Sequence, residues 1–393
     1  MRRARGPLGA VGWLVLGCGG SGSPPFDPCV AGDTVTLVEP REESRSGFAV
    51  LADDDGYAAF FSGPAIEGMP ERGPVFATRP GTAPRLLNPG VSAQALTTAR
   101  VAGGFLACWD SQAYSAGEPR SSGCLLVDDR LTVARDWRPS FGTVASLARV
   151  GSQLYALSWP DTDPATIEWR ALDEDGESQG AAMAPPCPEW AGWGDRRMAT
   201  SALGVACLIP SDPHCGRQFD EPPNCTYGLE LHTPDGQLLF SVPEIAPFGV
   251  YGSTILANVA AREDGFLVGW TDRENVWHGV PVAPDGSLGP QIDVPGAVAE
   301  HLQAVGGGYL ATWAGGVDAP RVYRWPMMML LSPLGELSRP PVEVAPQRDD
   351  LPFQYGPVAV GTSGHGIALL WEGAEDTAFY PSALLFRSLG CLP

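Results

Sequence analysis

The chain has 393 residues and a formal net charge of −20 at pH 7, with 45 acidic residues against 25 basic ones. Every basic residue is an arginine, so mechanisms that need a lysine nucleophile or a Schiff base are excluded. So acidic a chain repels nucleic acid and anionic lipid, and we expect neither as a partner.

The N-terminus reads as an export signal. Arginines at positions 2, 3 and 5 precede an apolar run from Leu8 to Gly17, which is too short to span a bilayer. The run ends in Val15-Leu16-Gly17-Cys18, which resembles the lipobox of bacterial lipoproteins, although Leu16 fits that pattern less well than a small residue would. In that family the cysteine is acylated and becomes the mature N-terminus. The alternatives are an ordinary secretory signal with a chance cysteine and a structural role for Cys18.

We therefore expect three segments: residues 1–17 as a lipoprotein signal peptide, residues 18–28 as a flexible tether, and residues 29–393 as one folded domain. The Gly/Ser/Pro run after Cys18 suits a tether. Acylation of Cys18 would hold the exported protein in the cell envelope, at the outer membrane or the cell surface. From Cys18 onward, 22 arginines face 45 acidic residues, a net charge of −23.

A motif of a turn residue, a short apolar run and an aromatic residue recurs along the domain. Its seven copies are spaced about 52 residues apart on average and end at Phe61, Trp109, Trp159, Ile209, Trp270, Trp313 and Trp371. A period near this value with a strand-like core is typical of a β-propeller. The sequence predicts an all-β, seven-bladed β-propeller of four-stranded blades, with six or eight blades as the alternatives.

Each repeat divides into four expected strands. The first is small and apolar, as around Ala257 and Val259, which suits the crowded centre of a propeller. The motif is the second strand, and a Pro-Asp-Gly turn such as Pro284–Gly286 joins the third to the fourth. We interpret the aromatic residue that ends the motif as a wedge packed between blades rather than as part of a site.

The last repeat lacks a fourth strand. The segment Thr34–Val38 is strand-like and precedes the first repeat, so we expect it to complete the last blade and close the ring. Cys29 would then lie near Cys391, and a disulfide between them would link the two ends of the closed ring covalently.

Eight cysteines remain besides Cys18, and an even number behind an export signal favours disulfides. Cys108 and Cys124 fall on adjacent strands of one blade, Cys215 and Cys225 bracket one loop, and Cys187 and Cys207 are left over. The sequence does not fix these connectivities. No cysteine lies in CxxC spacing, so we expect no metal site, and no motif calls for a cofactor.

The connections between strands differ in length. Those from second to third strand and from blade to blade are long in places and share one side of a propeller, which we call the long-loop face. The turns from first to second and from third to fourth strand are tight and share the opposite side, the short-turn face. The candidate ligand-binding residues on the long-loop face are Asp110, Trp190, Trp193, His214, Asp272, Tyr251 and Tyr355. The alternative is that each aromatic residue only covers its own loop.

The repeats and the lipobox-like cysteine together resemble the divergent propeller-repeat lipoproteins of bacterial envelopes, such as those of myxobacteria. The resemblance implies fold and location, not activity. The sequence contains no familiar catalytic motif, so no catalytic residue is assigned. We expect a monomeric, non-enzymatic binding module for a protein, peptide or glycan. The alternatives are a polysaccharide hydrolase or lyase that uses carboxylates on the long-loop face, favoured if two buried carboxylates converge there, and a structural envelope component.

Overall fold

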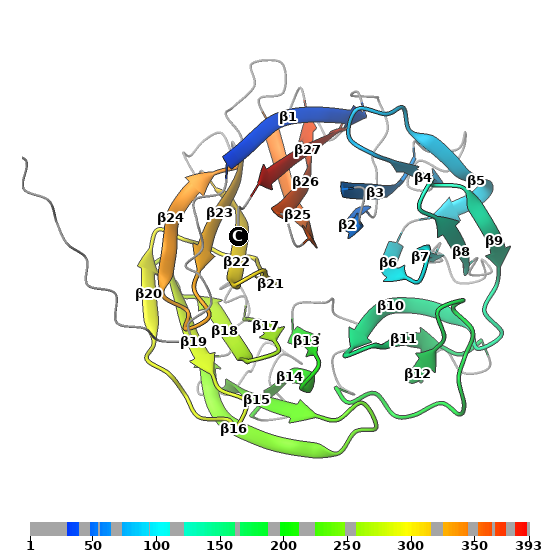
Figure 1. Ribbon diagram of the computed structural model, residues 1–393. Helices are drawn as coiled ribbons and strands as arrows, with labels where there is room; N and C mark the ends of the chain where they lie inside the picture. The colour runs from blue at the N-terminus through cyan, green and yellow to red at the C-terminus, as the bar shows by residue number, and fades with distance from the viewer. Residues whose placement is uncertain are drawn as a thin grey trace, which may run out of the picture.

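The computed structural model describes residues 30–38, 48–53, 56–63, 73–93, 95–110, 122–161, 166–187, 197–211, 225–247, 257–315, 325–344, 353–363, 366–374 and 382–390. Within these ranges the chain forms strands and turns, and it contains no helix long and apolar enough to cross a membrane. The strands make seven antiparallel sheets arranged as blades around one axis (Figure 1). The protein is a seven-bladed β-propeller, as predicted.

The first three blades occupy residues 48–187. Blade 1 contains β2 (Phe48–Asp53), β3 (Gly56–Ser62), β4 (Gly73–Thr78) and β5 (Arg85–Ala93); blade 2 contains β6 (Ala95–Val101), β7 (Gly104–Asp110), β8 (Ser122–Asp128) and β9 (Val133–Trp137); blade 3 contains β10 (Thr143–Val150), β11 (Gln153–Trp159) and β12 (Glu168–Leu172).

The other four blades follow in chain order. Blade 4 contains β13 (Met198–Ser201), β14 (Gly204–Pro210), β15 (Thr226–His232) and β16 (Leu238–Pro247); blade 5 contains β17 (Asn258–Arg262), β18 (Gly265–Thr271), β19 (Val276–Val282) and β20 (Ile292–Pro295); blade 6 contains β21 (His301–Val305), β22 (Gly308–Gly315), β23 (Trp325–Leu331) and β24 (Leu337–Glu343); blade 7 contains β25 (Phe353–Ser363), β26 (Gly366–Ala374), β27 (Ser382–Gly390) and β1 (Val30–Val38).

The outer strand of blade 7 comes from the start of the domain. β1 pairs antiparallel with β27, and Val30 lies opposite Gly390. Cys29 and Cys391, the sequence neighbours of this pair, lie outside the described residues, so a disulfide between them stays a prediction.

Blade 3 departs from the expected four strands. Its outer edge is reduced to isolated bridges, in which Trp169 and Met183 exchange two backbone hydrogen bonds of 2.9 and 3.0 Å and Leu172 pairs with Ser178. The segment that follows contains Pro185 and Pro186. Proline has no N–H to donate to a ladder, which accounts for the short pairing.

The repeated motif forms the second strand of every blade, and its aromatic ends are packed between blades. Phe61, Trp109, Trp270, Trp313 and Trp371 are all at most 5% exposed, whereas Trp159 and Ile209 are partly exposed. Trp371, for example, lies in a cluster with Leu310 and Met328 of blade 6. The interpretation of these residues as wedges is therefore confirmed for the five buried ones.

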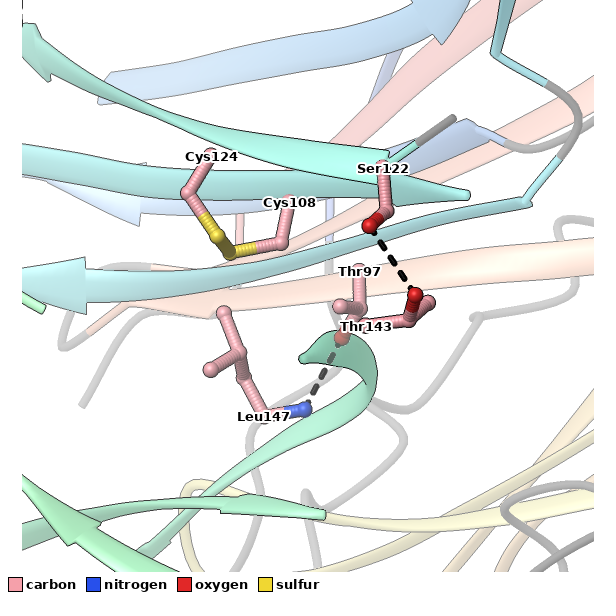
Figure 2. The surroundings of a disulfide bond; sticks show 6 residues. All are labelled: Thr97, Cys108, Ser122, Cys124, Thr143 and Leu147. Carbon is pink, nitrogen blue, oxygen red and sulfur yellow. Dashed lines mark hydrogen bonds between the residues drawn. A yellow bond between two sulfur atoms is a disulfide. The ribbon is translucent and has the colours of Figure 1, made fainter. Parts of the chain in front are cut away.

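Two disulfides are present among the described cysteines. Cys108 and Cys124 lie directly opposite each other on β7 and β8, 4.0 Å apart between Cα atoms (Figure 2). Cys187, in the segment after blade 3, is bonded to Cys207 on β14 of blade 4. Both pairs agree with the predicted pairing. Cys225 is disulfide-bonded as well, and its predicted partner Cys215 lies outside the described residues.

Hydroxyl groups join blades 2 and 3 beside the first of these disulfides. Thr143 on β10 donates a hydrogen bond of 2.9 Å to the buried Ser122 on β8. The backbone N–H of Leu147 donates 3.0 Å to Oγ1 of Thr97 on β6, as Figure 2 shows. β10 pairs with a neighbouring strand on one side only, so this contact satisfies part of its inner edge.

Candidate functional site

Three of the seven predicted site residues lie in the described part of the chain. Asp110 ends β7, Asp272 follows β18, and the backbone of Tyr355 lies in β25 opposite Glu372. The other four, Trp190, Trp193, His214 and Tyr251, lie outside the described residues. Asp110 belongs to blade 2 and Asp272 to blade 5, so two whole blades separate them around the ring.

Asp110 is a buried carboxylate. It lies opposite Ala95 on β6 and Ser122 on β8, at the long-loop end of blade 2, and is 2% exposed. Its carboxyl group is therefore not presented on the surface where a large ligand would meet it.

Asp272 belongs to a cluster centred on His278 of blade 5. The turn from β18 to β19 is tight, and Oδ1 of Asp272 accepts hydrogen bonds from the backbone N–H groups of Glu274 and Val276, at 3.0 and 2.8 Å. Its Oδ2 lies 2.9 Å from Nε2 of His278. Asp272 lies on the long-loop face, but its own connection is short and spans only four residues between β18 and β19.

The imidazole of His278 is held on three sides. Nδ1 lies 2.7 Å from Oδ1 of Asp293 on β20, and Gln291 also donates 2.8 Å to that oxygen. The ring stacks on Trp270, with centroids 5.3 Å apart and planes inclined by 27°. The pairing of β18 with β19 places Trp270 directly opposite His278, which explains the stacking.

These contacts shift three pKa values. Burial lowers the pKa of His278, but the hydrogen bonds to Asp293 and Asp272 outweigh it, and the net pKa is raised. The pKa of Asp272 is lowered, first by the N–H of Val276 and then by His278. The pKa of Asp293 is lowered by Gln291 and His278. The cluster therefore favours an imidazolium between two carboxylates.

In its protonated form the imidazole donates both of its N–H groups within the cluster. In that form it has no lone pair free to act as a general base or to bind a metal ion. The two carboxylates are separated by the ring instead of facing an open space. Among the described residues no group of three or more His, Cys, Asp or Glu side chains is placed to hold a metal ion.

A central cavity of about 680 Å³ runs along the axis, lined by the innermost strands of all seven blades. Its described lining is apolar or carries hydroxyl and amide groups, as at Leu147, Thr97 and Asn258, with Arg149 and His301 as its basic members. None of these lining residues is a carboxylate. The prediction that the first strand of each blade is the innermost one is confirmed.

His278, Asp293 and Gln291 were not among the residues singled out from the sequence. The sequence signal that could have pointed to this cluster is the short connection in blade 5, because a tight turn after Asp272 brings the end of β18 close to the start of β19. The step from there to Asp293 depends on the register of β19 with β20, in which His278 lies opposite Asp293. The sequence alone does not fix that register.

No family model matches the chain, and no curated protein matches it. Solved structures with a similar backbone include the β-propeller domain of the Trilobed protease from Pyrococcus furiosus, with 9% sequence identity, 92% of this chain and 94% of that chain covered, and a TM-score of 0.43. A mutant of puromycin hydrolase complexed with PGG has 16% identity, covers 85% of this chain and 52% of that chain, and has a TM-score of 0.45. An alpha-L-arabinofuranosidase from Podospora anserina in complex with cellotriose has 9% identity, covers 75% and 89%, and has a TM-score of 0.34. At these TM-scores the likenesses add nothing to the strand pairing, on which the fold assignment rests.

Proposed function

We propose that the protein is an exported, lipid-anchored propeller that binds a protein, peptide or glycan on its long-loop face without chemical turnover. The observation that carries the proposal is the unequal length of the connections. The first and second strands of blades 2–6 are joined by two residues, whereas β7 and β8 are joined by 11 residues and β14 and β15 by 15. Long connections on a rigid scaffold are where binding usually resides.

Binding is favoured over catalysis by the placement of the described acids. A glycoside-cleaving pair needs two carboxylates flanking an open space about 5–10 Å wide. Asp272 and Asp293 instead hold His278 between them, Asp110 is buried on another blade, and no carboxylate is among the lining residues of the central cavity.

Export and anchoring are part of the proposal. The disulfides Cys108–Cys124 and Cys187–Cys207 are expected in an oxidising compartment, which supports an export signal before Cys18. In a bacterial host, metabolic labelling with a fatty acid should label the full chain and not the Cys18→Ser variant. Label that survives in the variant would remove the anchor from the proposal.

The binding test uses the domain from Ser23, which contains every described strand. Glycan arrays and pull-down from envelope extracts are run beside assays for release of sugar fragments from polysaccharides. We expect a saturable ligand whose affinity falls when several residues of the long-loop face, Trp190, Trp193 and Tyr251, are changed to Ala. Asp175→Asn, at an exposed turn of the short-turn face, is the matched control and should bind normally. Fragment release that Asp110→Asn or Asp272→Asn abolishes would establish the enzyme instead.

A further inference from the structure

Exposed leucines gather on one part of the short-turn face. Six large apolar side chains of the described residues are more than 40% exposed, and five of them lie at the turn between the third and fourth strands of blades 4, 5 and 6. These five are Leu238, Leu239, Leu288, Leu334 and Leu337, which we call the leucine rim. The sixth, Leu86, lies near the start of β5, at the equivalent turn of blade 1, which is not adjacent to blades 4–6.

Strand register places the leucine rim at the short-turn end of its blades. Leu238 lies opposite His232 at the end of β15, and Leu337 lies opposite Leu331 at the end of β23. Leu288 is bridged to Val282 at the end of β19. The third strand of a blade ends at the short-turn face, so all three positions lie at that end of the propeller.

The turns between the third and fourth strands of blades 4, 5 and 6 lie on neighbouring blades. The ring of Phe240 in blade 4 packs over Gly286, where an added Cβ would meet it at 3.1 Å. The side chain of Ile292 in blade 5 packs in the same way over Gly335 in blade 6, at 2.6 Å from an added Cβ. The turns of blades 5 and 6 are therefore each in contact with the outer strand of the blade before, and the leucine rim extends over three adjacent blades.

The chain enters the propeller on the same face. Gly366 follows the short turn of blade 7 and lies opposite Gly390, and Gly390 in turn lies opposite Val30, the first residue of β1. Whatever precedes Val30 thus joins the fold at the short-turn end of blade 7. Blade 7 packs against blade 6, the last blade of the leucine rim.

We propose that the leucine rim rests on the lipid surface to which the acylated Cys18 holds the protein, so that the long-loop face points away from the membrane. The inference rests on the anchor in the proposed function. Cys18 lies 12 residues before Val30, so even an extended tether reaches only about 40 Å. A short tether that leaves from the short-turn face keeps the leucine rim close to the bilayer, and exposed apolar side chains bind at the lipid interface.

The same turns also indicate the kind of lipid. Asp235, Asp285 and Glu336 are exposed on the three turns beside the leucines. Anionic lipid would repel these carboxylates, whereas zwitterionic lipid would accept the leucines without that cost. The contact is thus apolar insertion into a neutral lipid surface, and it should weaken as anionic lipid is added.

The test holds the domain from Ser23 on phosphatidylcholine vesicles through an N-terminal hexahistidine tag and a small share of chelating lipid. Amide hydrogen exchange is then compared with the free domain. We expect slower exchange at residues 232–240, 283–289 and 331–338 on vesicles, and a smaller effect when phosphatidylglycerol is added. The protection should be lost when all five rim leucines are changed to Gln and kept in Leu86→Gln, since Leu86 is exposed outside the rim.

Equal exchange on and off vesicles, or protection at the β18–β19 turn of the long-loop face instead, would overturn the proposal. So would a concentration-dependent dimer of the free domain that the five-leucine variant loses, because the rim would then be covered by a second copy. The tag replaces the acyl group, so a failure of fatty-acid labelling at Cys18 and a failure of this test are separate results.

Discussion

Blades 1–6 each have a turn after the third strand on the short-turn face, yet the side chains around these turns differ between blades 1–3 and blades 4–6. In the first group several arginines donate from one blade to the next, whereas in blades 4–6 Arg262, which donates 2.8 Å to the backbone oxygen of Gly306, is the described example. Arg79 donates 3.0 Å to Asp53 in its own blade and 2.7 Å to the backbone oxygen of Asp129 in blade 2, and Arg100 is paired with Asp129. In the second group the turns carry five of the six exposed leucines of the described residues, and the sixth, Leu86, lies on blade 1.

The difference shows how one fold provides both a closed and an open surface. In blade 3, Arg149 donates 2.7 Å to the backbone oxygen of Arg100 and 3.0 Å to Glu174, whose other oxygen accepts from the N–H of Ala102 at 2.7 Å. These charged groups of blades 1–3 thus pair with one another and with backbone oxygens of the neighbouring blade. The five leucines of the leucine rim on blades 4–6, in contrast, stay more than 40% exposed.

The largest expected effect concerns the border between the two groups of blades. The disulfide Cys187–Cys207 links the end of blade 3 to blade 4 across 20 residues. Changing both cysteines to Ala should lower the free energy of unfolding by about 3 kcal/mol, because the unfolded chain gains the entropy of an open loop. Denaturant titration of the oxidised domain measures it.

The pair Cys108–Cys124 provides the matched control, because it closes a similar span of 16 residues inside one blade. Its removal should cost about the same by the same argument. If the Cys187→Ala/Cys207→Ala variant were as stable as the parent, the contact between blades 3 and 4 would not depend on this disulfide.

The next effect is expected at Arg79. The side chain of Asp53 is only 1% exposed, and that of Arg79 is 19% exposed. Arg79→Met would leave a buried carboxylate without its guanidinium and should lower the free energy of unfolding by about 2 kcal/mol, less than for a fully buried pair because Arg79 is partly exposed. The matched control is Arg135→Met, since its partner Glu177 and Arg135 itself are 44% and 42% exposed. That change should cost less than about 1 kcal/mol. Equal losses of stability in the two variants would contradict the view that the ion pair of Arg79 and Asp53 is a buried contact on the short-turn face of blades 1–3.

A smaller effect should depend on pH. The pKa of His278 is raised in the folded protein, so its contribution is complete below the unfolded value near 6.5 and is lost as pH rises through the folded pKa. The pKa values of Asp272 and Asp293 are lowered, so their contribution is complete above about pH 4 and is lost as pH falls through the folded values. His278→Gln should therefore destabilise most near pH 5.

Thermal unfolding of both proteins between pH 3 and pH 9 measures this difference. We expect it to shrink at both ends of the range and to stay below the effect of Arg79→Met. His232→Gln is the control, because Nε2 of His232 lies 2.9 Å from a single carboxylate, that of Glu230. A difference that does not change with pH would mean that the imidazolium and its two carboxylates do not act as a unit.

The sequence was sufficient for the architecture because the repeated motif is a local signal. Each copy forms one strand, and a large buried side chain such as Trp313 must pack wherever its strand lies. The cluster around His278 was not predictable, since it depends on which residue of β20 lies opposite β19. A shift of one residue would turn Asp293 away from the imidazole.

The leucine rim escaped prediction for a different reason. The run Leu238-Leu239-Phe240 reads as a buried strand, and Phe240 indeed packs on Phe266 of the next blade with ring centroids 6.0 Å apart. Hydrophobicity alone does not reveal that the outermost strand of a blade has solvent on one side. The exposure of Leu238 and Leu239 is set by the position of their strand at the outer edge of the ring of blades, and the sequence of the strand itself does not show it.

The smallest expected effect distinguishes the leucine rim from an ordinary core. Leu334 is 67% exposed and Leu288 is 52% exposed, so changing either to Gln removes little buried apolar area. Each variant should unfold within about 0.5 kcal/mol of the parent in denaturant titration, as exposed positions do. Leu310→Ala is the contrast, because Leu310 is 1% exposed in the cluster between blades 6 and 7, and its truncation should cost about 2–5 kcal/mol. A comparable loss from Leu334→Gln would mean that the rim is covered within the protein itself, and blades 4–6 would then be as closed as blades 1–3.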